Sequence, residues 1–204
     1  MYHRKLVFLA AFVVLAVLAS SCATSRPSGF LGTYENLSGG HHIEKVWHDQ
    51  SQVRAGHYGS VELAEINTTR IYDRSGVTPS DCVAWMRSSL VQSESSDRIL
   101  SLSGSGPPAR LHLAITEMNP GDAFTRMMIA ELGAGHTWVQ VEGRVVDPST
   151  NTVLVTFSDR RRGSGVIGFR DLGGDAGPAM VREMLESIAE DVKRELQEIF
   201  ALDE

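Results

Sequence analysis

Alternation of apolar and polar positions is clearest in the second half of the chain. Between residues 138 and 158, valines and a phenylalanine recur at alternate positions on both sides of the sequence DPSTN. Period-two alternation around a turn predicts a β-hairpin with one apolar face. The stretch RLHLAITEM, residues 110–118, predicts another strand that buries Leu111, Leu113 and Ile115. A less regular strand is expected near Tyr58–Ile66.

Two segments instead show the period of amphipathic helices. The first has Thr78 as its expected N-cap, Pro79 at the first helical position and Asp81 at the third, which suits a helix start. The second covers residues 177–200. Residues at helical spacing are expected to face the core in both segments. They are Cys82, Trp85, Met86 and Leu90 in the first, and Val181, Met184, Leu185, Ile188, Val192, Leu196 and Ile199 in the second.

The elements follow one another as strand, helix, strand, hairpin and helix. This order predicts an α+β fold, in which a small antiparallel or mixed sheet carries both helices packed on one face. Three parts of the chain are expected: a signal peptide over residues 1–21, a tether over residues 22–45, and a single periplasmic domain over residues 46–204. The tether stretch is rich in serine and glycine, with apolar residues that are expected to lie on the domain.

The first 21 residues have the pattern of a bacterial export signal. Arg4 and Lys5 precede an apolar run from Leu6 to Leu18, and small residues follow it up to Cys22. The run is shorter than the roughly 20 residues of a membrane-spanning helix. Three outcomes are compatible with this pattern: acylation of Cys22 after cleavage, ordinary cleavage that releases a soluble periplasmic protein, or an uncleaved anchor.

The sequence ASSC, residues 19–22, resembles the lipobox of bacterial lipoproteins. The resemblance implies that Cys22 becomes the first residue and carries acyl chains such as palmitate. By analogy with lipoprotein sorting, Ala23 at the next position implies the periplasmic face of the outer membrane. A free periplasmic protein is the alternative location.

Charge excludes one class of partner. The chain has a net charge of −6, and removal of residues 1–21, which contain Arg4 and Lys5 but no acidic residue, leaves −8. An acidic domain of this kind is poorly suited to binding nucleic acid. The expected partners are a membrane, through the lipid anchor, and an envelope protein. The sequence makes no prediction of oligomeric state.

Two stretches resemble Gram-negative lipoproteins that are classed only as a domain of unknown function. SGFLGTYENL, residues 28–37, is similar to their start, and residues 124–160 are similar to their glycine-rich turn followed by two strands. The order of elements is similar to that of the curli secretion channel lipoprotein and of the N-terminal domain of TolB. These resemblances imply a fold and a location, and they carry over no catalytic residue.

Partner contacts are predicted in two places. One is a glycine-rich loop with Arg160, Arg161, Arg162 and Arg170, because arginine binds phosphate and carboxylate groups well. The alternative is a solvated loop. The other is an apolar segment that contains Phe124, Met127 and Met128, since methionine-rich surfaces adapt to partners. The alternative there is ordinary core.

His41, His42 and His48 form the candidate metal site, in the stretch GGHHIEKVWHD. Their spacing matches no standard zinc framework, and a solvated stretch is the alternative. The sequence contains no GxSxG, SxxK, Walker A or paired-cysteine motif. The predicted function is therefore a non-enzymatic accessory or assembly module of the bacterial envelope, without a cofactor. A periplasmic protein that binds a metal or small ligand is the alternative.

Overall fold

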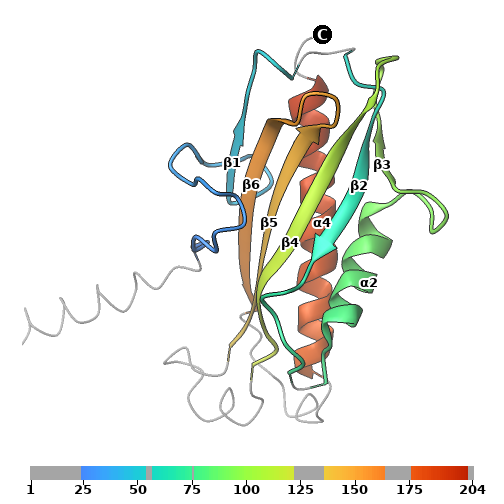
Figure 1. Ribbon diagram of the computed structural model, residues 1–204. Coiled ribbons are helices and arrows are strands. Elements are labelled where there is room, and N and C mark those ends of the chain that lie inside the picture. The colour runs from blue at the N-terminus through green and yellow to red at the C-terminus, as the bar shows by residue number, and fades with distance from the viewer. Residues whose placement is uncertain (1–23, 54–56, 75, 122–135, 164–175, 202–204) are drawn as a thin grey trace, which may run out of the picture.

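The molecule is built from one sheet and two helices. The computed structural model describes residues 24–53, 57–74, 76–121, 136–163 and 176–201. Within these ranges, six strands form a single mixed sheet, and both helices lie on the same face of it (Figure 1). The predicted α+β class is confirmed. We call the face without helices the open face.

The strands lie in the order β1-β6-β5-β4-β2-β3. Only β2 and β4 run parallel, and every other neighbouring pair is antiparallel. A parallel pair needs a crossover connection, and here α2 and β3 supply it. The bounds are β1 Lys45–His48, β2 Ser60–Asn67, β3 Arg98–Ser101, β4 Pro108–Asn119, β5 Thr137–Asp147 and β6 Thr152–Gly163.

The predicted hairpin is formed by β5 and β6. Its turn begins at Asp147, whose carboxylate accepts hydrogen bonds from the backbone and hydroxyl of Ser149, and ends at Asn151 with φ of 58°. Asparagine tolerates this left-handed conformation better than most residues do. β6 continues to Gly163. Arg160, Arg161 and Arg162 therefore lie in a strand, and their prediction as part of a loop is wrong.

Both predicted helices are present. α2 spans Pro79–Leu90 and begins with a capping box between Thr78 and Asp81, in which each side chain bonds the other residue's backbone N–H. α4 spans Ala176–Ala201. The predicted apolar positions of α4 are all buried, as are Cys82, Met86 and Leu90 of α2, whereas Trp85 is partly buried against the core.

Two edge strands, β1 and β3, are absent from the sequence-based prediction. Each has four residues, and each buries a single side chain, Val46 in β1 and Ile99 in β3. Alternation needs more positions than this before it can be recognised. Short edge strands also leave little unpaired backbone for association with other chains.

The core lies between the sheet and the helices. Gly143 in β5 allows the ring of Phe157 in β6 to pack across the strand, because a Cβ atom there would lie 2.2 Å from that ring. Val141, Val145 and Leu113 are fully buried around this contact. Among the described helices, none is long and apolar enough to cross a membrane.

Candidate functional site

The N-terminal segment, which we define as residues 24–38, lies across the open face of the sheet. Leu31 and Ser25 in it are buried, and Ser38 forms a β-bridge with Val46 of β1. In Figure 1 the segment, in dark blue, lies beside β1 and β6. The stretch that was predicted as a tether is thus packed on the domain almost from its first residue.

Gln140 holds the backbone of this segment. Its side-chain Oε1 accepts a hydrogen bond of 2.8 Å from the Arg26 N–H, and its Nε2 donates one of 2.6 Å to the Arg26 carbonyl. The amide side chain therefore pairs with a peptide group as a neighbouring strand would. Only 1% of Gln140 is exposed. A buried amide needs such partners, because leaving it unpaired would cost about 1–3 kcal/mol.

Glu142 holds the side chains of the segment. Its Oε2 accepts hydrogen bonds from the hydroxyls of Tyr34, at 2.6 Å, and Ser28, at 2.8 Å. Its Oε1 accepts one from Gln140 Nε2 at 2.9 Å. Glu142 has no exposed surface, so these donors replace the water that would otherwise solvate it. We call Gln140 and Glu142 the N-terminal clamp.

Tyr34 also organises the turn that precedes it. Its hydroxyl oxygen accepts hydrogen bonds from the backbone N–H groups of Ser28, at 3.1 Å, and Gly29, at 2.8 Å. Gly29 has φ of 90°, a conformation that glycine adopts without strain. The hydroxyl therefore joins the turn to buried Glu142, and this explains why the short segment has a defined shape.

Charged side chains support the start and the middle of the segment. Glu44 accepts the Ser25 N–H with both carboxylate oxygens at 2.9 Å. Arg160 donates to the Thr24 carbonyl at 3.3 Å and pairs with Glu117 at 2.9 Å. The guanidinium of Arg144 lies 5.4 Å from the centre of the Phe30 ring.

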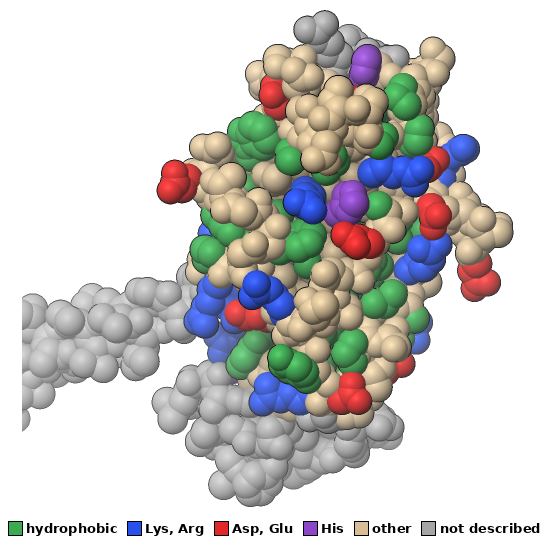
Figure 2. Space-filling view, in the orientation of Figure 1, with side chains coloured by type: hydrophobic (Ala, Val, Ile, Leu, Met, Phe, Trp, Pro, Cys, Tyr) green, Lys and Arg blue, Asp and Glu red, His purple; other side chains and the backbone are tan. Residues whose placement is uncertain are grey.

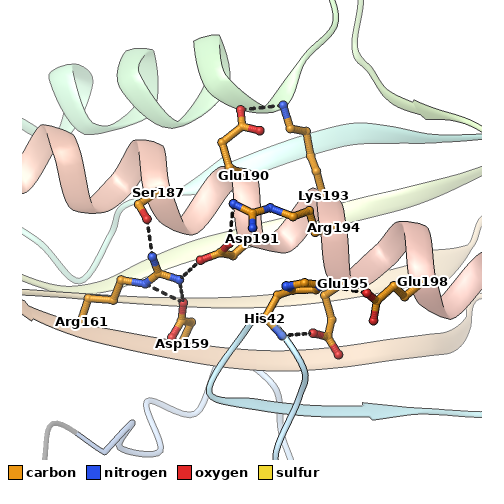
Figure 3. Close-up of polar contacts among 10 residues, drawn as sticks. All are labelled: His42, Asp159, Arg161, Ser187, Glu190, Asp191, Lys193, Arg194, Glu195 and Glu198. Carbon is orange, nitrogen blue, oxygen red and sulfur yellow. Dashed lines mark hydrogen bonds and ion pairs between the residues drawn. The ribbon is translucent and has the colours of Figure 1, made fainter.

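Arg161 points to the opposite face of the sheet, where it meets α4 (Figure 3). It donates to Asp159 at 3.1 and 2.9 Å and also binds Asp191 and Ser187 of α4. Burial raises the pKa of Asp159, and Arg161 opposes this effect. Burial tends to lower the pKa of Arg161, but Asp159 and Asp191 outweigh it and the pKa is raised. Arg161 thus joins β6 to α4 and is not a free contact residue.

The predicted histidine site lies near the C-terminal end of α4. His41 Nδ1 and His42 Nε2 each lie 2.8 Å from Glu198, and the two backbone N–H groups donate to Glu195 (Figure 3 shows His42 with both glutamates). Hydrogen bonds from His42 and His41 lower the pKa of Glu198. These contacts attach the chain before β1 to α4.

A pocket of about 260 Å³ adjoins this attachment, and His41 and His48 line it together with Glu195 and Glu198. His42 does not line the pocket. Within the described ranges, no group of three or more His, Cys, Asp or Glu side chains is placed to hold a metal ion. The structure therefore gives no geometric support to the metal site predicted from the sequence.

Most of the other residues singled out in the sequence lie outside the described ranges, and Cys82 lies inside them. Cys22, Phe124, Met127, Met128 and Arg170 lie outside the described residues. Cys82 is buried in α2, as predicted, and burial raises its pKa to about 12. A thiol with this pKa is almost wholly protonated at neutral pH and is a poor nucleophile.

Sequence reasoning did not identify the N-terminal clamp. Gln140 and Glu142 alternate with valines, which is also the pattern of a strand with one face in water. The available signal was the run of apolar residues Phe30, Leu31 and Tyr34, which require a surface to pack on.

We predict that Tyr34→Phe lowers the free energy of unfolding by about 2 kcal/mol, because it removes a hydrogen bond to a buried carboxylate. Tyr72→Phe is the matched control, since Tyr72 is 78% exposed and should change nothing measurable. Urea denaturation of both variants measures the difference. Equal stability of the two variants would show that the Tyr34 hydroxyl does not stabilise the fold.

We predict that Arg161→Ala lowers the free energy of unfolding by about 3 kcal/mol at neutral pH, because it leaves Asp159 buried without its cation. Arg182→Ala is the control, since its ion pair with Glu186 is exposed and should contribute less than about 1 kcal/mol.

The cost of Arg161→Ala should also depend on pH. Without Arg161, the folded-state pKa of Asp159 rises further above its unfolded value, so the variant loses stability as pH rises between these two values. Thermal melts should therefore show the largest deficit at neutral pH and a smaller one in acid. A deficit that grows in acid would contradict this role of Asp159.

The chain is similar to known proteins in its fold and over part of its sequence. Among solved structures, it is similar to PelC of Paraburkholderia phytofirmans, crystallised as a dodecamer, at 14% identity and a TM-score of 0.33, over 64% of this chain and 87% of that chain. It is also similar to a DUF330 protein of Xanthomonas campestris, at 13% identity and a TM-score of 0.33, over 70% of this chain and 91% of that chain. A search of the curated proteins gave no match. Residues 75–165, which run from before α2 through β6 and include the N-terminal clamp, match a family model described as Domain of unknown function (DUF4410).

Proposed function

We propose that this protein is an exported lipoprotein, acylated at Cys22, that acts as a non-enzymatic accessory or assembly module on the periplasmic face of the outer membrane. The sequence of residues 1–22 supports the export signal and the acylation site. The resemblances of the sequence to lipoproteins and to the curli and TolB domains also support this proposal.

The single observation that carries the proposal is the docking of the N-terminal segment. An acylated Cys22 would lie only two residues before Thr24, whose carbonyl is held by Arg160. Two residues span at most about 7 Å. The domain would then be held at the membrane surface, as suits a module that works on other envelope components there.

The use of the polar groups on the open face supports a non-enzymatic role. Gln140 and Glu142 bind the N-terminal segment of their own chain, and Arg160 pairs with Glu117. Polar side chains that bind their own chain in this way are not available to a substrate. Here they hold the part of the chain nearest the proposed anchor.

The proposal also includes a contact site for an envelope protein, with fewer arginines than the sequence alone suggested. Arg161 faces α4 and is taken up by Asp159 and Asp191, so it is unsuited to contact a partner. Arg160 and Arg162 lie on the open face, paired in register with Gln140 and Trp138. The alternative function, binding of a small ligand or metal, would use the pocket that His41 and His48 line.

We predict that protein purified from membranes has an intact mass that corresponds to a chain starting at Cys22 with added acyl chains. In a Cys22→Ser variant this added mass should be absent, and the protein should be found in the soluble fraction. Mass spectrometry of both proteins makes the measurement. An unmodified chain that starts at another residue would contradict the proposed anchor and would favour a free periplasmic protein.

A further inference from the structure

A pocket of about 250 Å³ lies on the open face, next to the N-terminal segment. Residues 70–74, which follow β2, form one wall, and Glu117, Asn119 and Trp138 are among the residues of the other. Tyr72 is 78% exposed and is the only large hydrophobic residue of the described chain that is so exposed.

Arg160 links this pocket to the start of the N-terminal segment. Its guanidinium pairs with Glu117 at 2.9 Å, lies 5.9 Å from the ring centre of Trp138, and donates to the Thr24 carbonyl at 3.3 Å. On the other side of the segment, Arg70 lies close to Gly29, since a Cβ atom at Gly29 would be 3.6 Å from its Nη2. The pocket and the segment therefore form one continuous surface.

This surface would be close to the membrane if Cys22 is acylated, so the inference rests on the proposed lipid anchor. Cys22 can lie at most about 7 Å from Thr24, and the headgroup layer on each side of a bilayer is about 5–7 Å thick. Residues in contact with Thr24 are thus within reach of the headgroups. The β5–β6 turn lies at the opposite end of the sheet, because β5 begins beside Asn119 and ends beside Arg110.

The charge of the surface differs in sign from that of the whole protein. Its acidic residues are Asp73 and Glu117 of the pocket, Glu35 of the N-terminal segment and the buried Glu142, and Glu117 is already paired with Arg160. Its basic residues are more numerous: Arg26, Arg70, Arg74, Arg160 and Arg162. Figure 2 shows Lys and Arg side chains at the lower left of the described surface, and others along its right side. The chain as a whole has a net charge of −6, so this local excess of arginine is a distinct feature.

Arginine and aromatic side chains together suit the membrane interface. Arginine binds phosphate groups with two hydrogen bonds, and tyrosine and tryptophan are enriched at the depth of the lipid headgroups. Trp138 and Tyr72 line the same pocket as Arg70 and Arg74. From this combination we infer that the surface formed by Arg70, Tyr72, Arg74 and Trp138 contacts the anionic phospholipid headgroups of the membrane in which Cys22 is anchored.

The experiment uses the acylated full chain reconstituted in vesicles of phosphatidylethanolamine and phosphatidylglycerol that carry a headgroup-attached quencher. Tyr72→Cys is labelled with a fluorophore, and Thr150→Cys, exposed in the β5–β6 turn, is labelled as the control. Labelling is selective, because Cys82 is buried with a pKa raised to about 12 and Cys22 is acylated. Vesicle flotation and intact mass report anchoring separately from contact.

We expect strong quenching of the label at position 72 and little quenching at position 150. Each arginine near an anionic surface contributes attraction that corresponds to about fivefold in the contact equilibrium. An Arg70→Gln, Arg74→Gln double variant should therefore lower the contact equilibrium on the order of tenfold or more and reduce quenching at position 72. The double variant should still float with the vesicles. Replacing phosphatidylglycerol with phosphatidylcholine should have a similar effect.

The two proposals fail differently. Protein that floats and carries acyl mass, but shows equal quenching at positions 72 and 150, would overturn the headgroup contact and leave the anchor intact. Quenching at position 72 that is unchanged by the double variant and by lipid charge would also overturn it. Protein without acyl mass that remains in the soluble fraction would instead contradict the anchor.

Discussion

Burial of an amide and a carboxylate on the open face of the sheet is the constraint on which this structure depends. Gln140 and Glu142 are at most 1% exposed, although neither of the two described helices covers them. Leaving such groups without hydrogen bonds would cost several kcal/mol in total. The chain meets this requirement with its own N-terminal segment, whose Arg26 backbone and Tyr34 and Ser28 hydroxyls supply the partners. A stretch without regular secondary structure is thereby ordered on one side of the sheet.

The opposite face of the sheet packs against the helices through an apolar core, and polar side chains bind α4 at the edge of that core. Arg161 joins β6 to α4 through Asp159 and Asp191, and Glu195 and Glu198 of α4 hold the backbone and rings of His41 and His42 (Figure 3). The chain before β1 is therefore attached at one end to the open face and at the other end to a helix behind the sheet. With both attachments in place, an anchor at Cys22 would hold the domain with its arginine-rich surface toward the membrane.

Most of the fold was predictable because its long elements have clear periods. The hairpin, the strand at residues 110–118 and both helices were predicted from alternation, from helical spacing and from the Thr78 cap. β1 and β3 were not, because four residues with one buried side chain carry too little pattern. The mistake over Arg160–Arg162 has a similar cause. The three arginines have no apolar alternation, yet backbone pairing with residues 138–140 extends β6 through them.

The candidate site was much less predictable than the fold. Gln140 and Glu142 occupy alternate positions that would face water in a two-layer protein, and nothing near them in sequence indicates that residues 114 positions away cover them. The same limit applies to the histidines. Histidine side chains often bind metals, so the sequence suggested a metal site at His41 and His42. Their actual partner, Glu198, lies more than 150 residues later, and the spacing of the histidines gave no sign of it.

Amide hydrogen exchange of the N-terminal segment tests the central claim most directly. If Gln140 and Glu44 hold the segment as described, the N–H groups of Arg26 and Ser25 should exchange orders of magnitude more slowly than in an unstructured peptide. The Gly29 N–H, bound by Tyr34, should be protected in the same way. Exchange of these three amides at the unstructured rate, while the amides of β5 remain protected, would contradict the account and show that the segment is free.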